Sequence, residues 1–132
     1  MEEYLLDNLI DQAKEISANA YVPYTNYPVG AALLADSGQI YLGASVDAAG
    51  HSGCCAERIA LYDAVIKGDT RFTALAVYSD GAHLPFPCGT CLQALSEFCP
   101  DQEMDVIVTC DDDMRIYKLK ELLPNPFIPL DD

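Results

Sequence analysis

Two short cysteine motifs contain the residues whose types and spacing could carry out chemistry. Cys55 is followed two positions later by Glu57, and two residues separate Cys88 from Cys91. Three thiolates can hold a Zn²⁺ ion and leave its fourth position for water, which is the arrangement of a catalytic rather than a structural site. A carboxylate that lies near such a metal without binding it can move protons for that water. We therefore predict one zinc ion per subunit, with the three cysteines as ligands and Glu57 as the catalytic proton carrier.

The cysteine spacing leaves other interpretations open. A redox dithiol has the spacing of Cys88 and Cys91, but such a pair normally follows the first strand of a thioredoxin-like fold, whereas this one lies deep in the chain after Pro87. A structural zinc site has no need of a neighbouring carboxylate. Cys54 could replace Cys55 as the first ligand, although the glutamate two positions after Cys55 favours Cys55.

Each motif follows a loop and opens a predicted buried helix, over residues 55–67 and 89–99. Helix N-termini carry unpaired N–H groups and partial positive charge, and both favour the thiolate form that binds metal. Three thiolates and Zn²⁺ sum to a net negative charge, which Arg58 would offset. Gln93 follows the second motif, and we expect it to support the metal ligands from behind.

The rest of the chain predicts an α/β fold that positions these helices. A helical period covers residues 2–20, and a helical turn at most covers 121–124. Strands are predicted over 29–35, 39–46, 72–78, 106–108 and 114–118. A hairpin followed by strands alternating with helices implies one mixed sheet with helices on both faces. At 132 residues, we expect positions 1–132 to form a single domain.

The charge excludes several classes of partner. Seven Lys and Arg residues stand against 21 Asp and Glu residues, a formal net charge of −14, and the only short basic run is residues 118–120. Nucleic acid binding requires Lys and Arg at phosphates, so neither a nucleic acid nor an anionic membrane is expected as partner. No apolar run is long enough for a bilayer, and the acidic N-terminus lacks a cationic signal region, which predicts a cytoplasmic protein. The cysteines outside the zinc motifs are expected to be small buried hydrophobic residues: Cys54, Cys99 and Cys110.

At its cysteine motifs the chain resembles the small cytidine deaminases. The resemblance is carried by residues 21–34, 55–58, 87–91 and 121–127, and it covers roughly residues 10–128. It implies a five-stranded α/β/α sandwich with one zinc ion, usually a homotetramer (a homodimer is the alternative) with active sites at subunit interfaces. It also implies a cytoplasmic hydrolase of pyrimidine salvage that converts cytidine and deoxycytidine to uridine and deoxyuridine.

The resemblance further implies a set of substrate-binding residues. Tyr27 stands where a phenylalanine usually stacks on the base, and Phe127 is a second stacking residue, donated by a neighbouring subunit. Ala56 lies inside the first zinc motif. Ser45 and Asp47 occupy the positions at which the family usually has an asparagine and a glutamate that grip the ribose.

These last two positions are also departures from the family. Serine is shorter than asparagine, and aspartate reaches about one methylene less than glutamate, so recognition of sugar hydroxyls should differ. Leu92 replaces a common arginine, and the loop before Cys55 is about one residue shorter, with His51 near a common tyrosine. The substrate could thus be a modified cytosine nucleoside or an antibiotic of the blasticidin S type. Rival readings are a deaminase of another aminated heterocycle and a zinc-stabilised binding module without turnover.

Overall fold

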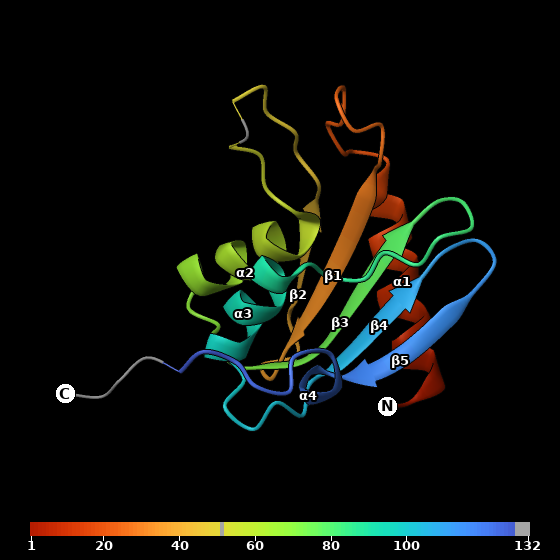
Figure 1. The fold of residues 1–132 in the computed structure, drawn as a ribbon. Coiled ribbons are helices and arrows are strands. Elements are labelled where there is room, and N and C mark those ends of the chain that lie inside the picture. Colours follow the sequence, from red (N-terminus) through yellow and green to blue (C-terminus); the bar gives the residue numbers. More distant parts are fainter. Residues whose placement is uncertain (51, 129–132) are drawn as a thin grey trace.

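A five-stranded mixed sheet organises the computed structural model, which describes residues 1–50 and 52–128 (Figure 1). Its strands lie in the order β2-β1-β3-β4-β5, and only β3 and β4 run parallel among the pairs of this sheet. The strands are β1 (Val29–Ala35), β2 (Ile40–Ala44), β3 (Phe72–Ser79), β4 (Asp105–Thr109) and β5 (Met114–Lys118). The helices are α1 (Glu3–Ser17), α2 (Ala56–Ile66), α3 (Gly89–Glu97) and α4 (Leu119–Leu122). The predicted mixed sheet is confirmed.

Helices cover both faces of this sheet, as the sequence predicts (Figure 1). On one face α1 buries Leu9 and Ala13 against Ala32, Ala76 and neighbouring side chains of the central strands. On the other face α2, α3 and α4 contribute to a larger apolar cluster with the opposite sides of β1, β3 and β4. Every residue of β1 is buried, which explains its unbroken run of small apolar side chains, typical of a strand covered on both faces.

Two glycines let helices approach strands closely. A Cβ atom at Gly43 in β2 would stand 2.2 Å from the carbonyl oxygen of Ala56 and 2.7 Å from the backbone nitrogen of Ala60. A Cβ atom at Gly30 in β1 would stand 2.0 Å from the carbonyl oxygen of Ala13. The backbones of α2 and α1 therefore lie directly on the sheet at these points. The contact at Gly43 fixes the first turn of α2, immediately after Cys55.

Some element boundaries differ from those predicted. Helix α1 ends at Ser17 rather than at residue 20, because the chain turns and then Tyr21 donates its N–H to the carbonyl oxygen of Ser45 at 2.9 Å. Helix α4 begins at Leu119, two residues before the predicted helical turn, and Glu121 Oε1 accepts the Lys118 N–H at 2.8 Å.

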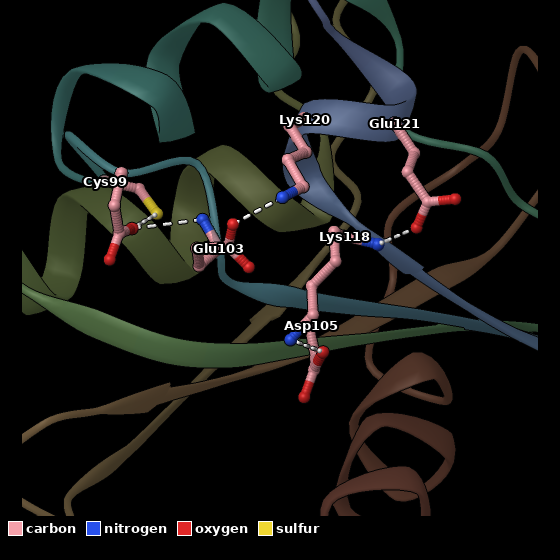
Figure 2. Close-up of polar contacts among 7 residues, drawn as sticks. Cys99, Glu103, Asp105, Lys118, Lys120 and Glu121 are labelled. Carbon is pink, nitrogen blue, oxygen red and sulfur yellow. Dashed lines mark hydrogen bonds and ion pairs between the residues drawn. The ribbon is translucent and has the colours of Figure 1, made fainter.

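The short basic run in the sequence forms no basic patch. Figure 2 shows Lys118 and Lys120 at the junction of β5 and α4, each facing a carboxylate. Lys118 Nζ lies 2.8 Å from Asp105, and Lys120 Nζ lies 2.5 Å from Glu103. The two lysines are therefore paired with carboxylates. Within residues 1–50 and 52–128, no helix has both the length and the apolar character needed to cross a bilayer.

Candidate zinc site

The three predicted zinc ligands gather at the N-termini of two helices. Cys55 is the N-cap residue of α2, Cys88 is the N-cap residue of α3, and Cys91 lies in the first turn of α3. Their three Sγ atoms lie within 4.8 Å of one another, and those of Cys88 and Cys91 are 3.5 Å apart. Tetrahedral zinc with bonds of about 2.3 Å requires sulfur atoms about 3.8 Å apart. The cluster therefore fits a zinc ion with three protein ligands.

Arg58 supplies positive charge to this cluster. Its Nη2 atom lies 3.7 Å from Cys55 Sγ, one helical turn along α2. The pKa of the Cys55 thiol is lowered to about 5, mainly by a hydrogen bond with Cys91 and also by the neighbouring Arg58. The same hydrogen bond between the two cysteines raises the pKa of the Cys91 thiol. A thiolate is thus favoured here even before metal binds. The Arg58 Nε–H is buried and has no hydrogen-bond partner in the part of the chain that the structure describes.

Glu57 is a buried carboxyl group beside the three thiols. Only 5% of its surface is exposed, and burial is the main cause that raises its pKa to about 7. A carboxyl group with a pKa near the working pH can both accept and donate a proton. Because Glu57 lies in the first turn of α2, it is close to the thiols without belonging to their cluster.

A pocket of about 680 Å³ opens in front of Cys55, Glu57 and Cys88, which all line it. This volume suits a small organic ligand. The other walls come from the aromatic loop of residues 21–28, from the segment that follows β2, and from the loop that precedes α3. The predicted substrate-binding residues among its lining are Tyr27, Ser45, Asp47 and Ala56.

Polar groups of the pocket wall are partly engaged with the protein itself. Ser45 Oγ accepts the Val29 N–H at 3.0 Å, which leaves the serine hydroxyl hydrogen free to donate to a ligand. Asp47 Oδ2 accepts the backbone N–H groups of Tyr24 and Thr25. Asp47 is thus an acceptor for the neighbouring loop as well as a residue of the wall.

Two other predicted residues lie away from this pocket. The Phe127 side chain is 72% exposed and does not line the pocket of its own chain. The Gln93 side-chain amide donates to the Phe127 carbonyl oxygen and accepts the Phe127 N–H, so both of its polar atoms are engaged with the tail. His51 lies outside the described residues. As expected, Cys99 and Cys110 are buried, whereas Cys54 is half-buried and lines the pocket.

The pocket also contains residues that the sequence analysis did not single out. Tyr24 and Thr25 face it from the aromatic loop, and Pro85 and Phe86 face it from the loop before α3. A usable signal existed for Phe86, because it lies two residues before the cysteine that begins the second motif. Thr25 carried no signal, because its role depends on contact with Asp47, which is 22 residues away.

Comparison with known proteins agrees with this site. Residues 4–108 match the family model described as "Cytidine and deoxycytidylate deaminase zinc-binding region". A cytidine deaminase from Sporosarcina psychrophila is 39% identical over 92% of this chain and 90% of its own length. A cytidine deaminase from Halalkalibacterium halodurans is 37% identical over 90% of this chain and 91% of its own length. The crystal structure of cytidine deaminase from Burkholderia pseudomallei superposes with a TM-score of 0.86 at 34% identity, covering 96% of this chain and all of the other.

The family model spans the whole stretch that carries the three cysteines and Glu57, and the solved relative superposes over 96% of this chain. The resemblance seen in the sequence is therefore confirmed, together with zinc as the cofactor that the three-cysteine cluster fits. The chain belongs to the cytidine and deoxycytidylate deaminase family of zinc-dependent enzymes.

Proposed function

We propose that this protein hydrolyses cytidine and deoxycytidine to uridine and deoxyuridine, with release of ammonia. The observation that carries the proposal is a buried carboxyl group, Glu57, beside three thiols at the base of a pocket of nucleoside size. The relatives named cytidine deaminase support the choice of substrate. The presence of Glu57 argues against a binding module without turnover, because a structural zinc site does not require a buried carboxyl group at that position.

The reaction replaces the amino group at C4 of the cytosine ring by oxygen from water. The chemistry that zinc supplies, when held by Cys55, Cys88 and Cys91, is Lewis acidity that lowers the pKa of water to about 7. Glu57 takes a proton from the attacking water as its oxygen bonds to C4, and passes it to ring N3, which receives the electron pair of the C4=N3 double bond. Glu57 then moves the remaining hydroxyl proton to the amino nitrogen, so that the C–N bond breaks, the C4=O bond forms and ammonia leaves. Arg58 stays fixed beside the Cys55 sulfur and offsets the thiolate charge throughout.

The remaining pocket residues orient the nucleoside. The Tyr27 ring, 42% exposed and part of the wall, is placed to stack on the base, and Ala56 lies beside the reacting end of the pocket. Ser45 and Asp47 line the sugar end, where the Ser45 hydroxyl has a hydrogen to donate. Gln93 supports the metal helix indirectly, because it ties the tail to α3.

We also propose that residues 1–132 form one zinc-dependent deaminase domain, that it works in the cytoplasm, and that it assembles as a homotetramer. The exposed ring of Phe127 supports assembly, because a large apolar side chain outside its own pocket is available to a neighbouring subunit. Sedimentation velocity at several protein concentrations measures the assembly directly. A monomer or a dimer at micromolar concentration contradicts the tetramer.

The function is tested by incubating the zinc-loaded protein with cytidine, deoxycytidine, blasticidin S and guanine while absorbance and ammonia are followed. We expect turnover of the two nucleosides. Turnover of blasticidin S alone would assign the protein to the antibiotic-type deaminases. This outcome is tested because Ser45 and Asp47 are shorter than the side chains that usually bind the ribose. Turnover of guanine alone would assign it to another heterocycle. No turnover of any compound by protein that holds one zinc per chain would refute the proposal.

A further inference from the structure

The carboxylate of Asp47 holds the middle of the aromatic loop. Its Oδ2 atom accepts the N–H of Tyr24 at 3.1 Å and the N–H of Thr25 at 2.9 Å. The Thr25 hydroxyl donates to the same oxygen at 3.1 Å and accepts the N–H of Tyr27 at 3.3 Å. A continuous set of hydrogen bonds therefore runs from Asp47 through Thr25 to Tyr27.

Backbone hydrogen bonds hold the two ends of the same loop. At its beginning the Asp47 N–H donates to the Tyr21 carbonyl oxygen at 2.7 Å, and the Tyr21 N–H donates to the Ser45 carbonyl oxygen. At its end the Ser45 N–H donates to the Val29 carbonyl oxygen at 3.0 Å, and the Val29 N–H donates to Ser45 Oγ at 3.0 Å. Figure 1 shows this loop and the segment after β2 rising beyond the same end of the sheet. The Asp47 side chain attaches the middle of the loop, between these two backbone attachments.

The loop middle forms one wall of the pocket. Tyr24, Thr25 and Tyr27 line it together with residues of the zinc motifs. Hydrogen bonds to an ionised acceptor are stronger than those between neutral groups. The N–H of Thr25 keeps the pKa of Asp47 below its ordinary value, so the acceptor is ionised at neutral pH.

We propose that Asp47 is a positioning residue of the deamination reaction: its carboxylate sets the place of residues 24–27 and, through them, the aromatic wall against which the substrate rests. The effect on catalysis rests on the proposed function. The anchor, by which we mean the hydrogen bonds of the Asp47 carboxylate to the loop, does not. Asp47 acts through the loop, whereas Ser45 lines the pocket and its Oγ accepts the Val29 N–H, so its hydroxyl hydrogen can donate to a ligand. The shorter aspartate thus serves the loop at a position where the resemblance predicts a direct contact with ribose.

Two substitutions at this position separate the two roles. Asp47→Asn keeps one oxygen to accept the Tyr24 and Thr25 N–H groups, and its amide nitrogen can donate to the Thr25 hydroxyl. In the wild type, Oδ1 has only a contact of 3.3 Å to the Thr25 hydroxyl and could accept a hydrogen bond from a substrate hydroxyl. Asp47→Asn places an N–H donor at that position, so such a bond to the substrate would be lost. Asp47→Ala removes the anchor. Thr25→Val removes only the hydroxyl bonds and is the milder second test if Asp47→Ala folds poorly.

The first readout is kinetic and uses cytidine with the zinc-loaded variants. For Asp47→Ala we expect KM to rise about tenfold or more with kcat changed less than about twofold, because the wall is displaced while Glu57 and the thiols are untouched. For Asp47→Asn we expect KM within about threefold of the wild type, a rescue by the variant that keeps the acceptor. A rise in KM for Asp47→Asn as large as that for Asp47→Ala would overturn the proposal, because the carboxylate would then act on the substrate itself.

The second readout needs no substrate. We expect hydrogen exchange at the Tyr24 and Thr25 amides to accelerate in Asp47→Ala and to stay slow in Asp47→Asn. Unchanged exchange in Asp47→Ala would overturn the anchor even if the enzyme is fully active. The expected exchange pattern in a protein that deaminates nothing would support the anchor and refute the proposed function, so the two failures remain distinct.

Asp36→Ala is the matched control. Asp36 is also an exposed loop carboxylate that accepts a threonine hydroxyl, that of Thr73 at 2.8 Å, but it follows β1 at the opposite end of the sheet. We expect Asp36→Ala to leave KM, kcat and exchange at Tyr24 and Thr25 as in the wild type. A rise in KM for this variant equal to that for Asp47→Ala would show a general loss of stability and would overturn the specific role of Asp47.

Discussion

The side-chain amide of Gln93 forms two hydrogen bonds with the backbone of Phe127. Gln93 Nε2 donates to the Phe127 carbonyl oxygen at 2.7 Å, and Gln93 Oε1 accepts the Phe127 N–H at 2.9 Å. Because Gln93 lies on α3 two residues after Cys91, the pair ties the C-terminal segment to the helix that carries two of the thiols. The position of the exposed Phe127 ring is therefore linked to the zinc site through one side chain.

Gln93→Glu should release the tail, because a carboxylate can accept the Phe127 N–H but has no hydrogen for the Phe127 carbonyl oxygen. We expect faster hydrogen exchange at the Phe127 amide and a loss of about 1 kcal/mol in the free energy of unfolding. The measurements are exchange by mass spectrometry and urea unfolding. Gln39→Glu makes the same change of charge at an exposed position and should alter neither. Equal exchange in both variants would contradict the role of Gln93.

Glu57→Gln should separate zinc binding from turnover. The amide has nearly the shape of the carboxyl group but cannot take a proton from water, so we expect kcat to fall by about 10²–10⁴-fold. Zinc content, measured by atomic emission, should remain one ion per chain. Glu97→Gln, an exposed change at the end of α3, should keep full activity. An active Glu57→Gln enzyme would show that another group moves the proton.

Arg58→Met should weaken zinc retention while the fold persists. The change keeps much of the side-chain length but removes the cation 3.7 Å from Cys55 Sγ, so the thiolate charge is no longer offset. We expect zinc affinity to fall by about 10–100-fold, measured by competition with a chromogenic chelator. Arg71→Met removes an exposed cation and should leave that affinity unchanged. Unaltered zinc affinity in Arg58→Met would contradict the assigned role.

Gly43→Ala should disturb the zinc site from a strand. The added methyl group would meet the Ala56 carbonyl oxygen at 2.2 Å, so α2 must move away from β2. We expect a loss of about 1–3 kcal/mol in the free energy of unfolding, the usual cost of overpacking, and weaker zinc binding because Cys55 moves with the helix. Gly50→Ala is the control, because among the described residues beyond its chain neighbours no atom lies within 4 Å of the new Cβ. Wild-type zinc binding by Gly43→Ala would show that the helix adapts without moving its thiol.

Tyr78 and Asp111 make stability depend on pH at both extremes. The Tyr78 hydroxyl donates to Asp111 Oδ1 at 2.6 Å. Burial and this hydrogen bond raise the pKa of Tyr78 to about 12, so its contribution is complete below about pH 10 and is lost as the pH rises toward 12. The same bond lowers the pKa of Asp111, whose contribution is present above the ordinary carboxyl pKa and is lost as the pH falls through the lowered value.

Tyr78→Phe tests this dependence by urea unfolding at a series of pH values. We expect the variant to be less stable than the wild type at pH 8, and this difference to shrink between pH 10 and 12. Asp111→Asn should likewise reduce the loss of stability in acid. A constant difference between Tyr78→Phe and the wild type up to pH 12 would contradict the raised pKa.

The sequence predicted those features that depend on local spacing. Cys88 and Cys91 lie one helical turn apart, so one helix start can direct both thiols at one ion, and the structure brings them together with Cys55. The sheet could be predicted as well, because β1 and β3 are continuous apolar runs bounded by turn residues. Element ends were less accurate, as at Ser17, because pairing with a distant segment decides where α1 stops.

Contacts between distant segments could not be predicted. The bond between Thr25 and Asp47 spans 22 residues and that between Gln93 and Phe127 spans 34. No periodicity marks either pair, because each depends on how loops come together once the sheet has formed. For the same reason the contact of the Asp47 Oδ2 atom with the loop could not be predicted, and the family resemblance predicts only that Asp47 binds the substrate.

The parallel pairing of β3 and β4 has a consequence for how this protein can be altered. The chain must cross from one end of the sheet to the other between these strands, and it does so through α3, so the second cysteine motif lies between β3 and β4, at the start of α3. Pocket and thiols are thereby confined to one pole of the molecule, while the turn at residues 36–39 occupies the other. Peptide tags, fusion partners or surface attachment at that distal turn would not cover the pocket or the thiols.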